Sequence, residues 1–293
     1  MSKPYALITG ASGLLGQSVC ELLNSDGYTT IALKHKINTL AHHQVNTFDD
    51  LSPLTRHFAL VINLAGAPIA GFPWTPSRKR ILRSSRIDLT HQLVESLKRN
   101  EVTCEHFISG SAIGFYGTGA EAVSETAPPG DDFSAQLCQQ WEAEALRASN
   151  FAQRTTVLRT GLVFSAAGGF LKPLILSTRL GVGAIMGSGG QGVSWIDHTD
   201  WLGGLKHIIT HKIEGAVNLT SPAPVRHDKL MKTLSTQLGR PLYFKIPEIM
   251  FRPVGEMKTL FLEGQFVLPS RLLETGYQFR FPTVKDSLTH ILS

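Results

Sequence analysis

The stretch "YALITGASGLLG", residues 5–16, passes from an apolar segment through a glycine-rich turn into a second apolar segment. Gly10, Gly13 and Gly16 form a GxxGxxG pattern between an expected strand and an expected helix. Glycines at this spacing permit a tight turn, close approach of backbone N–H groups to a pyrophosphate, and close helix–strand packing. The N-terminus of the helix would then direct its unpaired donors at the phosphates. The residues expected to contact a dinucleotide here are Gly10, Ala11, Ser12, Gly13, Leu14, Leu15 and Gly16.

A glycine turn can also be no more than a turn, so the surrounding pattern matters. Short apolar runs suited to buried parallel strands recur at 5–9, 29–33, 59–64, 105–109, 155–159 and 216–221. Helical patterns lie between several of them, at 14–23, 76–99 and 133–148. Strands that alternate with helices indicate right-handed crossovers and a parallel sheet covered on both faces. The sequence therefore predicts an α/β fold with a doubly wound parallel sheet, the NAD(P)-binding Rossmann fold.

The alternation of strands and helices ends near residue 160. Two later segments, 165–192 and 251–282, are rich in glycine, or in proline and aromatic residues, and lack clear periodicity. We expect them to belong to a smaller C-terminal substrate lobe packed on the sheet. The predicted division assigns 1–164 plus about 193–221 to the Rossmann domain and 165–192 plus 222–293 to the substrate lobe.

The end of the second expected strand indicates which dinucleotide binds. A carboxylate at that point would accept hydrogen bonds from the ribose hydroxyls and repel a 2′-phosphate, whereas a basic residue favours the phosphorylated cofactor. Here the strand is followed by Lys34, His35 and Lys36, and the first carboxylate is Asp49. The sequence therefore favours NADP(H) over NAD(H), although a basic loop at a sheet edge can also be merely solvated.

The composition excludes several other classes. The chain has 293 residues, 42% of them hydrophobic, as in a globular protein, and its net charge of +5 is spread without a basic stripe that would favour nucleic acid. Three separate cysteines make a disulfide framework or zinc site improbable. Because the sequence passes almost directly into a strand-like run, we expect no signal peptide, and no apolar run is long enough for a membrane span. We expect a cytoplasmic protein that binds neither membrane nor nucleic acid.

Several segments together resemble the extended branch of the short-chain dehydrogenase/reductase superfamily: "ITGASGLLG" (8–16), "FISGSAIGFYG" (107–117), "VLRTGLVFS" (157–165) and "SWIDHTDW" (194–201). Two more, "PPGDDFSAQLCQQWEAEA" (128–145) and "EGQFVLPSRLLETGYQFRFP" (263–282), are similar to an epimerase-like subfamily. Its members are often labelled nucleoside-diphosphate-sugar epimerases and have their own C-terminal domain of unknown function. The resemblance implies bound NADP(H), a small-molecule substrate such as a sugar nucleotide, and a homodimer formed through the helices at 76–99 and 133–148.

The resemblance also implies further cofactor contacts. In "NLAG" (63–66), Leu64, Ala65 and Gly66 would line the cofactor, and Arg86 would turn its guanidinium toward it from the long helix. The planar fork of an arginine suits phosphate and ribose oxygens. Ser109 and Ser111 would be cofactor-side and substrate-side contacts at the end of a strand. The other basic residues of that helix, Arg78, Lys79, Arg80 and Arg83, could gather an anion or simply form its solvated face.

The catalytic pair of the superfamily is missing. Short-chain dehydrogenases use YxxxK, in which the lysine lowers the tyrosine pKa. None of the five tyrosines has a lysine four residues later, and Tyr116 is followed there by Ala120. By register with the family, the pair would fall at Phe133 or Ser134 and then at Leu137 or Cys138.

The remaining catalytic candidates are Ser111 and Tyr116. Ser111 could orient a substrate oxygen or only satisfy a strand end, and Tyr116 could be an acid or a packed ring. Asp197, His198 and Asp200 could form an acid/base group, yet Asp200 could instead cap the following helix. Cys138 could be a redox thiol or a packed one. His42 and His43 lack further ligands at metal spacing, so no metal site is expected.

Two functions fit these observations. The first is an NADP(H)-binding epimerase-like oxidoreductase that acts on an unidentified small molecule without YxxxK. The second is a non-catalytic NADP(H)-sensing module of the same fold. A polar group beside the nicotinamide, with space for a substrate, would favour the enzyme; a face sealed by Phe and Trp rings would favour the sensor.

Overall fold

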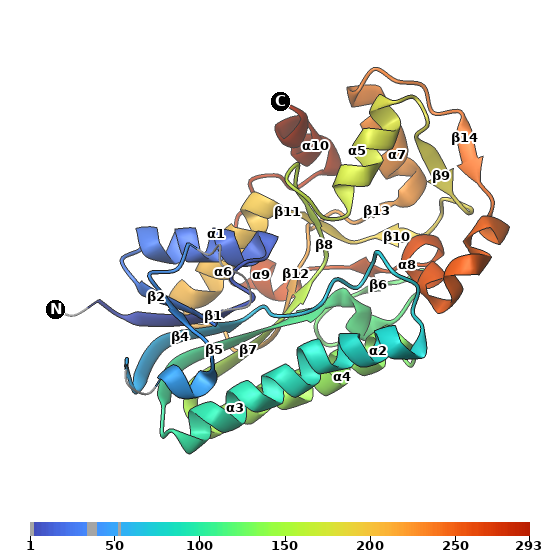
Figure 1. Ribbon diagram of the computed structural model, residues 1–293. Helices are drawn as coiled ribbons and strands as arrows, with labels where there is room; N and C mark the ends of the chain where they lie inside the picture. Colours follow the sequence, from blue (N-terminus) through green and yellow to red (C-terminus); the bar gives the residue numbers. More distant parts are fainter. Residues whose placement is uncertain (1–2, 34–39, 52–53) are drawn as a thin grey trace.

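The computed structural model describes residues 3–33, 40–51 and 54–293. Its centre is a parallel sheet with the strand order β12-β7-β5-β4-β1-β2-β3 (Figure 1). The order reverses between β1 and β4, which makes this the switch point of a doubly wound sheet. The predicted fold class is therefore confirmed. The strands are β1 (Tyr5–Thr9), β2 (Thr29–Leu33), β3 (His43–Val45), β4 (His57–Asn63), β5 (Thr103–Ala112), β7 (Ala152–Thr160) and β12 (Gly215–Leu219).

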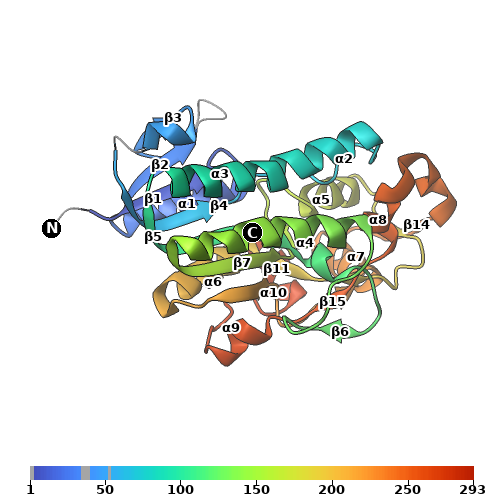
Figure 2. The ribbon, with the colours of Figure 1, turned by 90° about the horizontal axis from the view of Figure 1, so that it is seen from below.

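Helices cover both faces of the sheet because neighbouring strand residues point in opposite directions. Ile8 belongs to a core cluster packed under α1 (Leu14–Ser25) and α6 (His198–His211). Leu7, the preceding residue, belongs to the opposite cluster, which includes side chains of α3 (Leu89–Arg99) and α4 (Phe133–Leu146). The helix expected at 76–99 is α2 (Pro76–Arg83) joined to α3 by a π-helical turn. Figure 2 shows the joined helices α2 and α3 beside α4.

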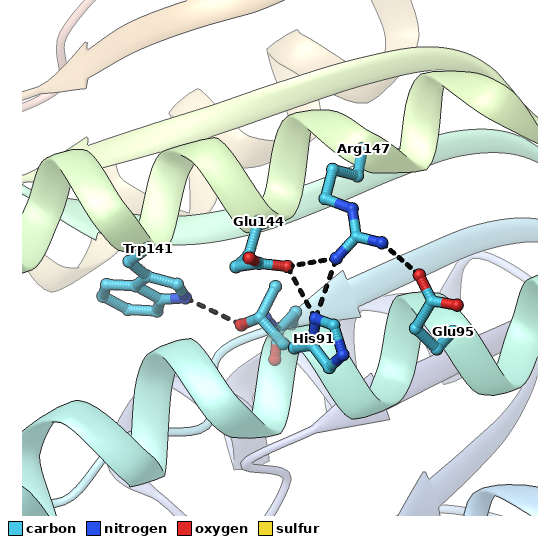
Figure 3. Close-up of polar contacts among 7 residues, drawn as sticks. His91, Glu95, Trp141, Glu144 and Arg147 are labelled. Atoms are coloured by element: carbon cyan, nitrogen blue, oxygen red, sulfur yellow. Dashed lines mark hydrogen bonds and ion pairs between the residues drawn. The ribbon is translucent and has the colours of Figure 1, made fainter.

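A polar cluster joins α3 and α4 near the outer surface (Figure 3). Arg147, at the C-terminal end of α4, donates to Glu144 at 2.7 Å and also pairs with Glu95 of α3. His91 lies 3.0 Å from the same Glu144 oxygen. These two helices are the ones through which a homodimer is expected, and that dimer stays a prediction.

The second lobe has its own apolar core. Phe164 and Trp195 stack with ring centroids 5.1 Å apart and pack with Leu171 and Leu230. Its helices are α5 (Leu171–Arg179), α7 (His227–Gln237), α8 (Thr259–Leu262), α9 (Ser270–Glu274) and α10 (Val284–Leu292). Two-stranded pairs complete the chain: β8 (Leu162–Phe164) with β11 (Trp195–Asp197), β9 (Ala184–Met186) with β14 (Phe244–Ile246), β10 (Gly192–Val193) with β13 (Val225–Arg226), and β6 (Ala122–Val123) with β15 (Phe266–Val267).

The C-terminal part of the chain contributes to the core of the Rossmann sheet as well as to the second core. Leu272 of α9 is buried in the core cluster that contains Ile8, and Tyr277 and Phe279 pack against the same cluster. Part of the C-terminal tail therefore covers the Rossmann sheet. The boundaries at 164, 193 and 221 remain a prediction. Within the described parts of the chain, no helix combines the length and the hydrophobicity needed to cross a bilayer.

Candidate functional site

The glycine-rich turn lies at the switch point of the sheet. Gly10 has φ +70°, and a Cβ there would lie 2.7 Å from the carbonyl carbon of Leu64. A Cβ on Gly16 would come within 2.1 Å of the carbonyl oxygen of Gly10, so the helix can approach the loop only without a side chain. Gly13 is the N-cap of α1 and supplies no side-chain cap. Among the described residues, no side chain accepts from the first N–H groups of α1, which leaves them free for an anion at the helix N-terminus.

A buried hydrogen-bond network fixes the strand ends around this turn. The Asn63 amide accepts from Thr9 at 2.6 Å and donates to Thr90 at 2.8 Å and to Ser109 at 3.2 Å. Ala65 N donates to the Thr9 hydroxyl at 3.3 Å, which brings the "NLAG" segment against the end of β1. Ser109 is fully buried in this network. Its predicted contact with the cofactor stays a prediction, as do those of Leu64 and Ala65.

Arg86 points at the same region. A Cβ on Gly66 would meet the Arg86 guanidinium carbon at 3.1 Å, and that guanidinium lies 5.3 Å from the centroid of the Trp141 ring. Burial lowers the pKa of Arg86 from its ordinary value. Among the described residues no carboxylate pairs with it. A partly desolvated guanidinium without an acidic partner is suited to bind an anion.

A pocket of about 300 Å³ opens beyond the carboxyl ends of β5 and β7 and is closed by the second lobe. Its wall includes Arg86 and Ser111 from the Rossmann side and His227 from α7. Trp141, Phe170 and Phe261 contribute rings without filling the space. Such a crevice is where doubly wound folds bind their ligands. None of residues 10–16 lines it, so the pocket is separate from the phosphate loop.

Ser111 is held by a buried ion pair that the sequence analysis did not foresee. Its hydroxyl donates to Glu142 Oε1 at 2.6 Å. Arg159 donates to both carboxylate oxygens of Glu142, from Nε to Oε1 and from Nη2 to Oε2, each at 2.9 Å. The three side chains are nearly inaccessible to solvent. Burial acts to lower the pKa of Arg159, but the hydrogen bonds and charge of Glu142 outweigh it and raise that pKa.

Tyr116 belongs to the same network without lining the pocket. Its hydroxyl accepts from Arg159 Nη1 at 2.9 Å and donates to Asn218 Oδ1 at 2.7 Å. Burial raises the pKa of the Tyr116 phenol, even though Arg159 opposes the rise. A catalytic tyrosine of a short-chain dehydrogenase needs the opposite shift. The geometry thus favours the packing role, in which Tyr116 and Phe115 enclose the Arg159 guanidinium.

The residues expected by register with the family in place of the YxxxK pair all lie on α4. Ser134 and Cys138, four residues apart on α4, both line the pocket, and both lie near Gly114. Phe133 faces elsewhere, against Trp74. Burial raises the pKa of the Cys138 thiol to about 12, so the thiol is neutral. No ammonium or phenol therefore occupies the usual catalytic positions.

The group suggested by "WIDHTD" does not assemble in the pocket. Asp197, not Asp200, is the N-cap of α6, accepting from Thr199 N at 2.8 Å. Asp200 instead accepts the backbone N–H groups of residues 280 and 281 and ties down the C-terminal tail. His198 lies 3.0 Å from Ser18 of α1. These residues hold elements together, and the expected cap at Asp200 is corrected to Asp197.

Three residues predicted to bind the cofactor, Lys34, His35 and Lys36, fall outside the described residues. Within the described ranges no three His, Cys, Asp or Glu side chains are grouped to hold a metal.

The functional residues that sequence reasoning missed are Glu142, Arg159 and His227. A charged residue ending the apolar run "TTVLR" was the available signal for Arg159; His227 gave none.

The fold and the crevice define a protein of the NAD(P)-binding Rossmann class. The chain belongs to the NAD dependent epimerase/dehydratase family, whose model matches residues 6–219, and residues 246–291 match a domain of unknown function, DUF1731. It is 31% identical to the chloroplastic SDR39U1 homolog of Arabidopsis thaliana, an epimerase family protein, over 99% of this chain and 87% of the relative.

Two solved structures are similar across nearly the whole chain. The human epimerase family protein SDR39U1 (isoform 2), crystallised with NADPH, is 27% identical with a TM-score of 0.86, over 98% of both chains. MoeE5 in complex with UDP-glucose and NAD is 18% identical with a TM-score of 0.79, over 98% of this chain and 97% of that one. At that identity MoeE5 shares the fold alone.

Proposed function

We propose that the protein binds NADP(H) along the phosphate loop and acts as an epimerase-like oxidoreductase on a small molecule in the pocket. The observation that carries the proposal is the presence of three features at the carboxyl ends of the strands: the N-terminus of α1 with its glycine N-cap, the Arg86 guanidinium that pairs with no carboxylate among the described residues, and a pocket lined by Ser111. The human relative crystallised with NADPH supports the choice of cofactor.

The glycine-rich turn fits a dinucleotide on steric grounds. Cβ atoms at Gly10 and Gly16 would occupy the space that lets the loop, β4 and α1 meet. The N–H groups at the start of α1 would bind the pyrophosphate, and Arg86 beside Gly66 would bind a phosphate or ribose oxygen. Lys34 and Lys36 would bind the 2′-phosphate. When bound, the nicotinamide supplies hydride exchange.

Ser111 determines what kind of substrate group can lie beside it. Its proton is directed at Glu142, a carboxylate held by Arg159, so its oxygen can accept from a group in the pocket or from the neighbouring Cys138 thiol. A hydroxyl oxygen in that state accepts a hydrogen bond. Ser111 therefore orients a substrate hydroxyl, and Glu142 lies one hydrogen bond farther as an acceptor for the proton. This arrangement can serve an alcohol being oxidised without a tyrosine.

A specific observation favours the non-catalytic alternative. By the expected register with the family, Phe133 or Ser134 and then Leu137 or Cys138 would replace the tyrosine and lysine, and of these Ser134, Leu137 and the neutral Cys138 line the pocket. In that case the cofactor is a ligand whose occupancy changes partner binding. The open pocket with Ser111 in its wall favours the enzyme, because a sensor needs no room for a substrate.

Calorimetric titration with NADPH and NADH tests the cofactor assignment. We expect NADPH to bind more tightly, Arg86→Gln to weaken it about tenfold or more, and the control Arg80→Gln, on the exposed face of α2, to leave it unchanged. Failure of NADPH to bind the wild-type protein would overturn the proposal.

Isotope transfer separates the enzyme from the sensor. Protein loaded with NADP⁺ reports oxidation of an alcohol by forming NADPH, and protein loaded with NADPH deuterated at C4 reports reduction of a carbonyl by transferring deuterium. Both are incubated with a small-molecule cell extract, which is then analysed by mass spectrometry. Either signal, if it is lost in Ser111→Ala with cofactor binding intact, supports the enzyme. Binding of both cofactor forms without either signal supports the sensor.

A further inference from the structure

The pocket wall supplied by the second lobe contains two neighbouring polar side chains. Gln191 precedes β10 and His227 follows β13, and these two strands pair. His227 N donates to the Gln191 carbonyl oxygen at 3.0 Å, which places the two residues side by side. Both line the pocket, on the wall contributed by the C-terminal lobe.

The imidazole ring of His227 is buried and has no hydrogen-bond partner among the described residues. Its exposed fraction is 1%, and neither ring nitrogen has a partner among the described residues. Burial lowers the pKa of the imidazole to about 4, so it is neutral near pH 7. A neutral imidazole offers one N–H donor and one acceptor. Buried donors and acceptors are almost always hydrogen-bonded in folded proteins, so the donor and the acceptor of this ring, which have no partner among the described residues, need an explanation.

Gln191 adds an acceptor beside it. Its amide nitrogen donates to the carbonyl oxygens of Met186 at 3.1 Å and Phe261 at 2.7 Å. Those two bonds fix the orientation of the amide, and they leave Oε1 buried without a partner. A ligand hydroxyl could donate to Gln191 Oε1 and accept from His227, whereas a ligand carbonyl would accept from His227 alone.

The rest of the pocket is unsuited to a highly charged ligand. Arg86 is the single cation among its lining residues, all of which are described, and it lies against Gly66 on the cofactor side. Two acidic residues, Asp132 and Glu263, are also in the wall. A sugar nucleotide carries a diphosphate that needs cations or clustered N–H donors. The volume of about 300 Å³ also lies at the small end of the range for ligand pockets.

We propose that the pocket takes a mainly apolar, uncharged small molecule, and that His227 and Gln191 bind a neutral hydroxyl or carbonyl group on it. This inference rests on the proposed function, because it names the substrate class of the same pocket. It differs from the expectation of a sugar nucleotide that the family resemblance carries.

Ligand-observed NMR on the NADPH-saturated protein tests the inference. The probes are a set of neutral aromatic and alicyclic alcohols and ketones, toluene as the hydrocarbon control, and UDP-glucose as the sugar nucleotide. The variants are His227→Leu and Gln191→Leu, with His211→Leu on the surface of α6 as the matched control. Imidazole nitrogen shifts of ¹⁵N-labelled protein report directly on His227.

The expected result is saturable binding of several alcohols or ketones that moves the His227 nitrogen signals. His227→Leu should weaken these probes about tenfold, the equivalent of one hydrogen bond, and leave toluene and NADPH unaffected. The variant should fold, because leucine removes two unpaired buried nitrogens, and its melting temperature should equal or exceed that of the wild type.

Three results would overturn the inference: no neutral probe binds at millimolar concentration, UDP-glucose displaces the bound probes, or His227→Leu leaves their affinity unchanged. The same titrations run without NADPH keep the two proposals apart. If NADPH does not bind the wild-type protein, the cofactor assignment is refuted. If His227→Leu binds the probes as tightly as the wild type does, only the substrate class is refuted.

Discussion

Replacing Glu142 by leucine would leave the Arg159 guanidinium buried beside Ser111 without its carboxylate. Arg159 is 5% exposed and Glu142 6% exposed, and two charge-assisted bonds of 2.9 Å join them. Removing one partner of such a pair costs about 3–5 kcal/mol, because the remaining charge stays desolvated. Against a typical stability of about 5–15 kcal/mol, we expect Glu142→Leu to lose about a fifth or more of the free energy of unfolding.

The double variant Glu142→Leu/Arg159→Met separates charge burial from packing. With both charges gone, the cost should fall well below the sum of the single changes, by about 2 kcal/mol or more. Tyr116 would keep its bond to Asn218. Urea unfolding followed by tryptophan fluorescence gives each free energy.

The control is a partly exposed carboxylate–arginine pair near the C-terminal end of the same helix, Glu144 with Arg147, whose side chains are 24% and 39% exposed (Figure 3). Glu144→Leu and Arg147→Met should each cost much less than Glu142→Leu, because water screens partly exposed charges. If Glu142→Leu costs no more than Glu144→Leu, or if the double variant costs the full sum of its parts, the ion pair is not what holds Ser111, and the account of the site is wrong.

Three other predictions follow from the described contacts and from the sequence. Burial holds the pKa values of His106 and His227 at about 4, below the ordinary 6.5. Between these pH values the two imidazoles are therefore protonated in the unfolded chain but neutral in the folded chain. Stability should therefore be retained above pH 6.5 and lost as the pH falls toward 4; urea unfolding should show His227→Leu losing about 2 kcal/mol less than wild type between pH 7 and 5. Gly16→Ala should abolish NADPH binding and lower the melting temperature, because its Cβ would lie 2.1 Å from a carbonyl oxygen, whereas Gly119→Ala, with open space, should do neither in calorimetry. Exchanging Lys34 and Lys36 for glutamate should weaken NADPH far more than NADH in fluorescence titrations, and equal losses would contradict the 2′-phosphate assignment.

The sheet could be predicted because its strands are buried on both faces and read as continuous apolar runs. β1 and β2 match the expected ranges, and β12 belongs to the sheet as expected, where it pairs with β7. β3 was missed because three residues with one buried side chain carry no apolar run. The second lobe was recognised only by its irregular composition, since its strand pairs join segments far apart in sequence, such as Gly192 with Arg226.

The two ends of the site differ in how far the sequence predicts them. The phosphate loop is local: three glycines within seven residues meet a steric need that any reader of the chain can recognise. The ion pair is not local, because Ser111, Glu142 and Arg159 come from β5, α4 and β7 and meet only when the sheet and its covering helix are in place. His227 could not be found from the sequence, because what distinguishes it is a buried ring without a hydrogen-bond partner among the described residues.

The absence of YxxxK changes the electrostatics of the pocket as well as its acid/base chemistry. A lysine in the usual place would put a free positive charge beside the substrate. Here Arg159 is linked to Ser111 through Glu142, which neutralises it through two hydrogen bonds. The pocket wall holds one cation, Arg86, which lies against Gly66, and two acidic residues, Asp132 and Glu263, whereas Ser111, Gln191 and His227 are uncharged. We therefore expect a neutral ligand on two grounds: the missing lysine, and the His227 imidazole that has no partner among the described residues.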